Sequence, residues 1–527
     1  MTVSAPLVSV VIPVYNSMPY LTATLESVLA QDVESLEVIA VDDGSTDGSG
    51  EELDRFDELD ERLTVIHQEN SGWPGAPRNR GLERARGEFV FFMDSDDTIA
   101  PHALRTMATM AEERGADVVI PRMQGVAGRG VQSLFQRYPQ GDIGLSRAME
   151  TLSPQKLFRR EPLERDGLRF PEEHVRLEDG IFVTRAYVLA RKILFCGQDP
   201  LYFIALRDDG QNISARSIDP ENYVSSCRRI AQTLLEGVPD PERAARLVWQ
   251  FFTRKGLRFY APRRWLAMDA DRKREWVSLH RAFLRDLVPP ELDRRAPNPT
   301  DRRKAALIRS GDVEGLDRLI SAAAGLDHHS RATAVVRVPE GIELTITLAG
   351  AEPGADAAAG AVEGMGNGTG ADGSGSGSLI RSGRASDLRL RVADRLHRAL
   401  RPVLGSHLGR GLSRRLTDAV SIGAPRVHLL LSGRRSARRV AVPGRAGRPD
   451  ASGALRYRFI LPDELLRRFR GDRVDMWTVA EVRGLSGGAV RVGADKVSKR
   501  GAGDGRSSVN VELYATDQGN ASLRFAR

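Results

Sequence analysis

The sequence predicts an α/β domain with a mostly parallel sheet, followed by a helical region and a C-terminal β-sandwich. From Val8 to about Gln124, apolar runs of strand length alternate with amphipathic stretches of helix length. Apolar residues recur at helical spacing from Pro220 to about Leu326, and from Thr333 the hydrophobic period changes to two. A βαβ series is typical of parallel strands joined by right-handed crossovers, whereas many short alternating strands are typical of a sandwich.

The strand Phe89–Met93 organises the first region. Its apolar run predicts burial on both faces, and it ends in Asp94, Ser95 and Asp96. Ligands of open α/β sheets bind beyond the carboxyl ends of the strands. Carboxylates one residue apart are hard oxygen ligands, so Asp94 and Asp96 predict a Mg²⁺ or Mn²⁺ site, although a bare Asp-x-Asp is also typical of an acidic turn that caps a helix.

The other elements of this region follow in a regular order. The predicted strands are 8–14, 36–41, 63–67, 89–93 and 117–120, and the predicted helices are 20–30, 49–58, 78–86 and 102–114. In the C-terminal region the predicted strands of an immunoglobulin-like sandwich are 333–338, 343–348, 427–431, 439–442, 455–461, 474–482, 489–492, 509–513 and 522–525. A stretch rich in Gly, Ala and Ser at 351–379 predicts a linker, and 390–422 predicts a basic helical segment, either lying on an anionic surface or packed on the sandwich.

Composition limits the partners of the chain. It has 527 residues and a net charge of +7, with the basic excess between about Arg381 and Arg470. No RNA-binding motif, metal-finger spacing or helix-turn-helix accompanies this charge, so we expect no nucleic acid and favour an anionic polymer or membrane surface. Only Cys196 and Cys227 occur, and no apolar stretch is of signal or membrane-spanning type. We therefore expect a cytoplasmic protein, at most peripheral at the inner membrane face.

Four motifs carry a family resemblance. They are Val-Ser-Val-Val-Ile-Pro-Val-Tyr-Asn at 8–16, Val-Asp-Asp-Gly-Ser-Thr-Asp at 41–47, Asn70 with Arg-Asn-Arg-Gly at 78–81, and Phe-Met-Asp-Ser-Asp-Asp at 92–97. Their order and spacing resemble the family 2 nucleotide-sugar glycosyltransferases with the GT-A fold, over roughly the first 210 residues. The domains expected from this resemblance are a catalytic domain at 1–217, a helical linker at 218–330 and a sandwich at 331–527.

The chemistry of a nucleotide donor explains the first three motifs. Tyr15 beside Pro13 can pack on a pyrimidine face, and Asp43 can accept from the ring N–H that uracil has and cytosine lacks. The alternative is that Asp43 only stabilises its own turn. Asn70 and Arg78, with the helix N-terminus, are expected to face the ribose and diphosphate.

The resemblance also assigns the later polar residues. Glu178 and Asp179 open a helical run, where they serve equally well as helix caps. In similar transferases such a pair carries the base, which implies Asp179 as base and Glu178 as a ligand of sugar or acceptor hydroxyls. The family closes a basic, hydroxyl-bearing loop over the diphosphate, which implies Arg207 and Ser214, although a solvated turn is an equal alternative.

These residues predict an inverting transfer. A metal on Asp96, assisted by Asp94, neutralises the leaving nucleoside diphosphate, and Asp179 deprotonates a hydroxyl that attacks from the opposite face. A glycoside hydrolase has no use for a uracil pocket or a metal.

The order of transferase, helical linker and sandwich resembles the subgroup that attaches N-acetylglucosamine to wall teichoic acid in Gram-positive bacteria. This implies UDP-N-acetylglucosamine as donor and an anionic polyol-phosphate or saccharide acceptor. In the subgroup the sandwiches bind polymer or mediate trimerisation, which implies a homo-oligomer. The Gly-rich and Arg-rich insertions depart from the subgroup. The alternatives are a transferase of capsular or lipid-linked saccharide synthesis, or a catalytically silent wall-polymer binding protein.

Overall fold

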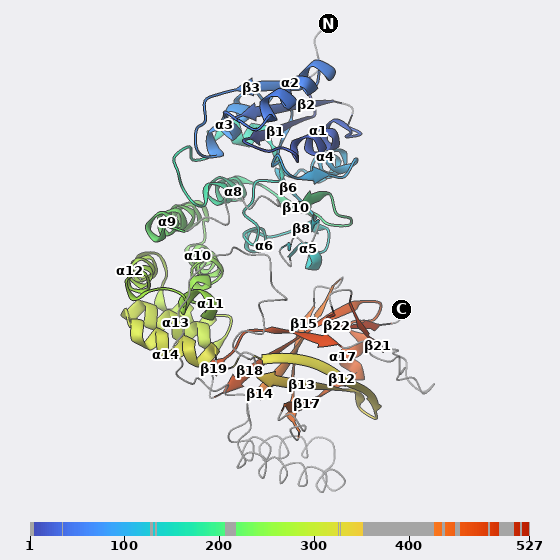
Figure 1. The fold of residues 1–527 in the computed structure, drawn as a ribbon, viewed down its shortest axis with the longest axis vertical. Helices are drawn as coiled ribbons and strands as arrows, with labels where there is room; N and C mark the ends of the chain where they lie inside the picture. Colours follow the sequence, from blue (N-terminus) through green and yellow to red (C-terminus); the bar gives the residue numbers. More distant parts are fainter. Residues whose placement is uncertain are drawn as a thin grey trace. The chain divides into compact units, whose positions relative to one another are not determined.

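The computed structural model describes residues 5–33, 35–126, 130–131, 134–205, 218–324, 326, 328–350, 426–434, 438–447, 454–482, 485–494, 511–516 and 519–525. The chain divides into two compact units (Figure 1). The first contains residues 1–258 and 271–292, and the second contains residues 259–270 and 293–527. The predicted linker at 351–379 and basic segment at 390–422 lie outside the described residues.

The first unit is built on an eight-stranded sheet with strand order β3-β2-β1-β4-β9-β6-β10-β8. β3, β2, β1 and β4 are parallel, as are β6 and β10, whereas β9 is antiparallel to both β4 and β6, and β8 is antiparallel to β10. The strands are β1 (Val8–Val14), β2 (Leu36–Asp42), β3 (Leu63–His67), β4 (Phe89–Phe92), β6 (Val118–Pro121), β8 (Gly141–Asp142), β9 (Leu157–Arg159) and β10 (Ile193–Cys196). The predicted mostly parallel sheet is confirmed.

Helices cover this sheet, and a small second sheet stands beside it. The helices are α1 (Leu21–Leu29), α2 (Ser49–Leu59), α3 (Gly75–Arg84), α4 (Ala103–Arg114), α5 (Leu134–Arg137), α6 (Leu145–Ala148), α7 (Arg160–Arg165) and α8 (Glu178–Leu189). The small sheet has the order β5 (Thr98–Ile99), β11 (Tyr202–Ile204) and β7 (Met123–Gly125). α3 begins three residues before the predicted start, because Pro77 is tolerated in a first turn where its missing N–H is not needed.

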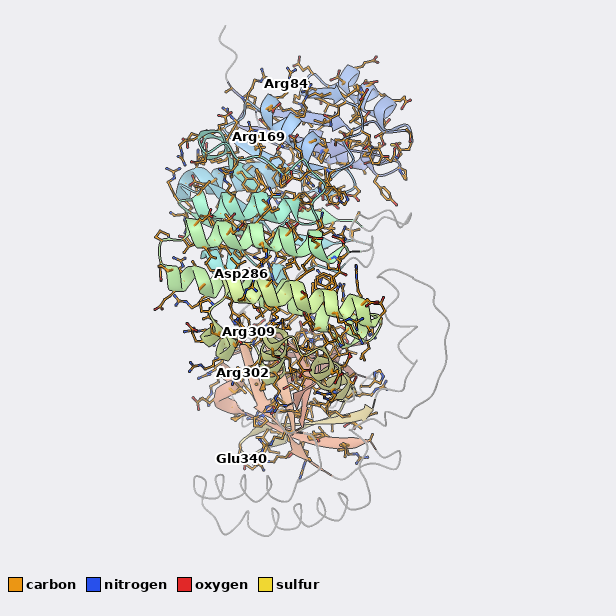
Figure 2. The ribbon with its side chains drawn as sticks, turned by 90° about the vertical axis from the view of Figure 1, so that its left-hand side faces the viewer. Arg84, Arg169, Asp286, Arg302, Arg309 and Glu340 are labelled. Carbon is orange, nitrogen blue, oxygen red and sulfur yellow. The ribbon has the colours of Figure 1, made fainter. Side chains whose placement is uncertain are left out.

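One glycine brings α3 close to the sheet. A Cβ at Gly81 would lie 2.4 Å from Cγ1 of Val11 in β1, a distance that no side chain tolerates. The glycine of the Arg-Asn-Arg-Gly motif therefore lets α3, which ends at Arg84 (Figure 2), lie directly on the central strand. Arg78, earlier on this helix, is thereby held near the carboxyl ends of β1 and β4.

Three long helices complete the first unit: α9 (Pro220–Gly237), α10 (Pro241–Lys255) and α12 (Ala270–Leu287). α9 and α10 both begin with Pro at the first helical position, after Asp219 and Asp240, whose carboxylates accept from backbone N–H groups of the first turn. Asp286 of α12, labelled in Figure 2, accepts from Arg228 of α9 at 2.8 Å. Trp249 and Trp276 are buried and belong to the core of these helices.

In the part of the second unit that the structure describes, a few helices are combined with eleven strands. Its α-helices before the strands are α11 (Pro262–Trp265), α13 (Pro299–Ser310) and α14 (Val313–Ala324). Arg309 of α13 pairs with Asp293 at 2.9 Å (Figure 2). The strands are β12 (His328–Val338), β13 (Gly341–Gly350), β14 (Arg426–Gly433), β15 (Arg439–Pro443), β16 (Arg445–Ala446), β17 (Leu455–Pro462), β18 (Arg473–Val482), β19 (Leu485–Ser486), β20 (Val490–Ala494), β21 (Val511–Ala515) and β22 (Ala521–Phe525), with α17 (Asp463–Arg467) after β17.

These strands form a near-barrel sandwich. The main path runs β15-β14-β18-β20-β12-β13-β17-β16, so its two end strands, β15 and β16, are separated in the chain by Gly444 alone. The sheet therefore folds back on itself around a core that includes Leu344, Leu429, Phe459 and Met476. Every strand predicted for this region is present. No helix among the described residues is long and apolar enough to cross a membrane.

Candidate active site

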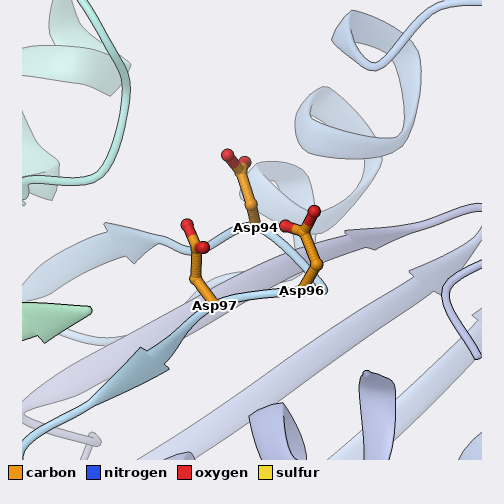
Figure 3. Close-up of side chains that lie close together, drawn as sticks. All are labelled: Asp94, Asp96 and Asp97. Atoms are coloured by element: carbon orange, nitrogen blue, oxygen red, sulfur yellow. The ribbon is translucent and has the colours of Figure 1, made fainter. Parts of the chain in front are cut away.

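Three carboxylates meet in the loop that follows β4. One oxygen each of Asp94, Asp96 and Asp97 lies within 4.8 Å of the others, and Figure 3 shows the three side chains gathered around one region. Clustered carboxylates repel one another unless protons or a cation neutralise them. This donor set fits Mg²⁺ or Mn²⁺, which prefer oxygen ligands. Asp94 and Asp96 were the predicted ligands, and Asp97, the last residue of the 92–97 motif, is an additional member.

Asp97 is the most enclosed of the three. Tyr202 donates its hydroxyl to Oδ2 at 2.7 Å, and the backbone N–H of Ala205 donates to Oδ1 at 2.9 Å. Burial raises the pKa of Asp97 well above its ordinary value, and the charges of Asp94 and Asp96 raise it further. Tyr202 comes from β11, so this contact depends on the small second sheet and has no local signal in the sequence.

Asp94 is held through both of its oxygens. Oδ1 accepts from Nη2 of Arg78 at 3.1 Å, and Oδ2 accepts from the side-chain amide of Gln155. A carboxylate fixed in this way is pre-oriented, which suits the assisting role expected for Asp94 beside Asp96.

Arg78 connects the acidic loop with the predicted base. Its side chain is buried, and Nη1 donates to Oδ1 of Asp179 at 2.7 Å while Nη2 contacts Asp94. Glu178 lies 4.0 Å from Nη1. The sequence led us to expect contacts between Arg78 and the donor nucleotide; the structure brings Arg78 between two carboxylates, and the nucleotide contact stays a prediction.

Glu178 and Asp179 open α8, as predicted. Glu178 is buried, and burial together with the neighbouring Asp179 raises its pKa to about 8, against the opposing charge of Arg78. Burial also raises the pKa of Asp179, although Arg78, Lys156 and Lys255 all act in the opposite direction. A carboxylate whose pKa is raised toward neutrality is suited to accept a proton from a hydroxyl.

The residues predicted to bind the uracil ring of the donor lie at the ends of β1 and β2. Tyr15 is 47 % exposed, and Pro13 pairs with Val41 inside the sheet. The carboxylate of Asp43 accepts from Nε2 of Gln68 at 2.7 Å and from the N–H and hydroxyl of Ser71 at 2.9 and 2.8 Å. In these contacts Asp43 stabilises the loop that contains Gln68 and Ser71, whereas the alternative interpretation named the turn of Asp43 itself.

Asn70 lies next to the Asp43 turn. Gly44 has a φ of +74°, and a Cβ there would lie 2.9 Å from the backbone N of Asn70, so only glycine allows this approach. The side chain of Asn70 accepts from the N–H of Gly72 at 2.6 Å. Arg207 and Ser214, predicted to close over a diphosphate, lie outside the described residues.

Comparison with known proteins identifies the class. The model of "Glycosyl transferase family 2" matches residues 9–165, and that of "Glycosyl transferase TarS linker domain" matches residues 220–320. Glycosyltransferase GlyG of Streptococcus pneumoniae is 34% identical over 223 residues, which are 38% of this chain and 71% of GlyG. The chain belongs to glycosyl transferase family 2, which confirms the family resemblance.

Two further relatives match this chain over longer stretches and are named for poly(ribitol-phosphate). Poly(ribitol-phosphate) beta-glucosyltransferase of Bacillus spizizenii is 33% identical over 315 residues, 59% of this chain and 49% of that protein. Poly(ribitol-phosphate) beta-N-acetylglucosaminyltransferase TarS of Staphylococcus aureus is 36% identical over 251 residues, 47% of this chain and 44% of TarS. The matches thus span just under half the length of these two relatives.

Solved structures agree with the fold. TarS residues 1–349 of S. aureus, in complex with UDP-GlcNAc, match with a TM-score of 0.55 and 29% identity, covering 64% of this chain and 96% of that one. The longer TarS structure matches with a TM-score of 0.57 and 23% identity, covering 98% of this chain and 85% of that one. The second likeness concerns the fold alone, and it confirms the predicted order of domain types.

Proposed function

We propose that this chain is an inverting, metal-dependent glycosyltransferase that moves N-acetylglucosamine from UDP-N-acetylglucosamine to a hydroxyl of an anionic wall polymer such as poly(ribitol phosphate). The observation that carries the proposal is the pair of acidic groups joined by Arg78: a metal-type cluster on one side and the pair Glu178–Asp179 on the other. Transfer needs both, because charge must be neutralised on the leaving group while a proton leaves the acceptor.

The roles of the residues follow from their positions. Asp96, with Asp94 and Asp97, would hold Mn²⁺ or Mg²⁺, which supplies positive charge for the departing diphosphate. Asp179 takes the proton of the acceptor hydroxyl, and Arg78 keeps Asp179 oriented for that step. Because the base acts from the face opposite the leaving group, the anomeric configuration is inverted.

The donor side is supported by Asp43 and Tyr15. Among the described residues, Oδ2 of Asp43 receives one hydrogen bond, from the hydroxyl of Ser71, so it has capacity for the ring N–H of uracil. The exposed ring of Tyr15 offers a flat face to the base. The ligand of the TarS complex, UDP-GlcNAc, supports the choice of donor.

The acceptor side is supported by positive charge near Asp179. Burial, together with the neighbouring charges of Arg254 and Arg258, lowers the pKa of Lys255 to about 8. A phosphate group nearby would favour the charged form of Lys255. Two relatives named for poly(ribitol-phosphate) agree with such an acceptor. The expected cytoplasmic location, peripheral membrane contact and trimeric state belong to the same proposal.

One assay separates this proposal from its alternatives. Purified protein is incubated with UDP-N-acetylglucosamine, with and without Mn²⁺ and poly(ribitol phosphate), and UDP release is measured. We expect slow metal-dependent release that the polymer accelerates. Release that only a capsular or lipid-linked saccharide accelerates would favour the alternative acceptor. If the protein releases no nucleoside diphosphate from any nucleotide-sugar, the remaining alternative is a catalytically silent protein that binds wall polymer.

A further inference from the structure

Lys156 is a lysine with no exposed surface. Its exposed fraction is 0%, and its ammonium donates to the hydroxyl of Thr151 at 3.5 Å and to the backbone carbonyl of Ser153. Both of these partners are uncharged, and burying an ammonium costs several kcal/mol. Burial lowers the pKa of Lys156 to about 7. An apolar side chain would fill this space at lower cost, so packing does not explain the lysine.

The sheet topology places Lys156 beside the acidic loop. β9 begins directly after Lys156 and runs antiparallel to β4, with Leu157 opposite Phe91. The residues that precede β9 therefore lie at the carboxyl end of β4, where Asp94 follows. Gln155 accordingly reaches Asp94 with its side-chain amide.

The same segment contacts the helix that carries the predicted base. Tyr187 of α8 donates its hydroxyl to the carbonyl of Thr151 at 3.0 Å. Asp179 lies in the first turn of that helix, and the charge of Lys156 lowers the pKa of Asp179. The segment from Thr151 to Lys156 thus contacts Asp94 of the acidic loop and Tyr187 of the helix that begins with Glu178 and Asp179.

We propose that Lys156 is a positioning residue for the transfer reaction: it holds the segment from Thr151 to Gln155 against α8 and, in its protonated form, adds positive charge that acts on Asp179. This inference rests on the proposed function. The charged and titratable groups that act on Asp179 or share its site are Arg78, Asp94, Lys156, Glu178 and Lys255. Arg78 is already paired with Asp94 and Asp179, whereas the hydrogen bonds of Lys156 leave its charge uncompensated.

The test is the pH profile of kcat/KM for transfer by the full chain and by Lys156→Met. Methionine keeps an unbranched side chain one heavy atom shorter than that of lysine and removes the charge. Asp179 should then bind its proton more tightly, so the acid limb should move to higher pH by about half a unit or more. Lys304, a buried lysine on α13 in the second unit, provides the matched control, and Lys304→Met should keep the wild-type profile.

Each outcome decides the proposal. An unchanged acid limb in an active Lys156→Met enzyme overturns the inference and leaves the transferase intact. No turnover by the wild-type chain overturns the proposed function, and the inference with it. If Lys156→Met does not fold, Lys156→Gln keeps a donor without the charge and should give the same shift. Thr151→Val keeps the ammonium of Lys156 and removes one of its hydrogen bonds, so this variant should lower kcat without moving the acid limb of the pH profile. An acid limb that moves in Thr151→Val overturns the role of the charge.

Discussion

Nη1 of Arg78 lies 2.7 Å from Oδ1 of Asp179, an ion pair between residues 101 positions apart in the chain. The same guanidinium contacts Asp94 at 3.1 Å, so one buried side chain on α3 connects the acidic loop after β4 with the start of α8. A planar guanidinium can donate hydrogen bonds to two carboxylates in a fixed geometry, whereas an ammonium group has no such fixed geometry.

Replacing Arg78 with Lys should therefore impair catalysis. Breaking a buried ion pair costs about 3–5 kcal/mol, so we expect turnover to fall by about 100-fold or more. Steady-state UDP release measures the effect. Arg80→Lys, at an exposed position of the same helix, is the control and should retain wild-type turnover. Equal activity of Arg78→Lys would contradict the bridging role.

Asp179→Asn should keep donor binding and lose transfer. The amide has nearly the same shape as the carboxylate but does not take up a proton, and general bases contribute about 10²–10⁴-fold. Calorimetric titration with UDP and measurement of kcat separate binding from chemistry. Full activity of Asp179→Asn would remove the base assignment.

Glu178 should make stability depend on pH. Its pKa is raised by burial from 4.5 to about 8, so the folded state holds the proton more tightly than the unfolded state. The stability that this carboxyl contributes is complete below about pH 4.5 and is lost as the pH rises through about 8. The thermal midpoint of the wild type should accordingly fall across this window relative to Glu178→Gln. Parallel midpoint curves for the two proteins would show that the carboxyl is not protonated in the folded state.

Asp96→Ala should abolish metal-dependent turnover. At an effective dielectric near 20, a pair of unit charges about 4 Å apart is worth roughly 4 kcal/mol, or about three decades in rate. Chelation should silence the wild type, and Mn²⁺ should restore it. Direct Mn²⁺ binding by electron paramagnetic resonance provides a second readout. Glu83→Ala, which removes an exposed carboxylate from α3, should change neither property.

Asp43→Asn should weaken the preference for uracil. A hydrogen bond to a charged acceptor contributes about 1.5–3 kcal/mol, so UDP affinity should fall about tenfold or more while CDP affinity changes less. Calorimetry with the two nucleotides gives the ratio directly. An unchanged ratio of UDP affinity to CDP affinity would mean that Asp43 only stabilises the loop that contains Gln68 and Ser71.

Much of the fold was predictable because its signals are local. The apolar run before Asp94 marks a buried strand, and the alternation from Thr333 onward marks the strands of the sandwich. The Asp-Ser-Asp-Asp stretch, Asp43 and the pair Glu178–Asp179 were recognisable because each follows or opens an element at a characteristic place. The position of β9 was not predictable, since insertion of a three-residue antiparallel strand between β4 and β6 leaves no periodic pattern.

The sequence by itself determined the family, the order of domain types and the residues that can carry the chemistry. Only the tertiary structure decided which residues meet: Arg78 with Asp94 and Asp179, Tyr202 with Asp97, and the segment before β9 with Asp94 and with Tyr187 of α8. The physical reason is that periodicity and turn chemistry act over a few residues, whereas these contacts join elements that are distant in the chain. Such pairings depend on how the whole sheet is assembled.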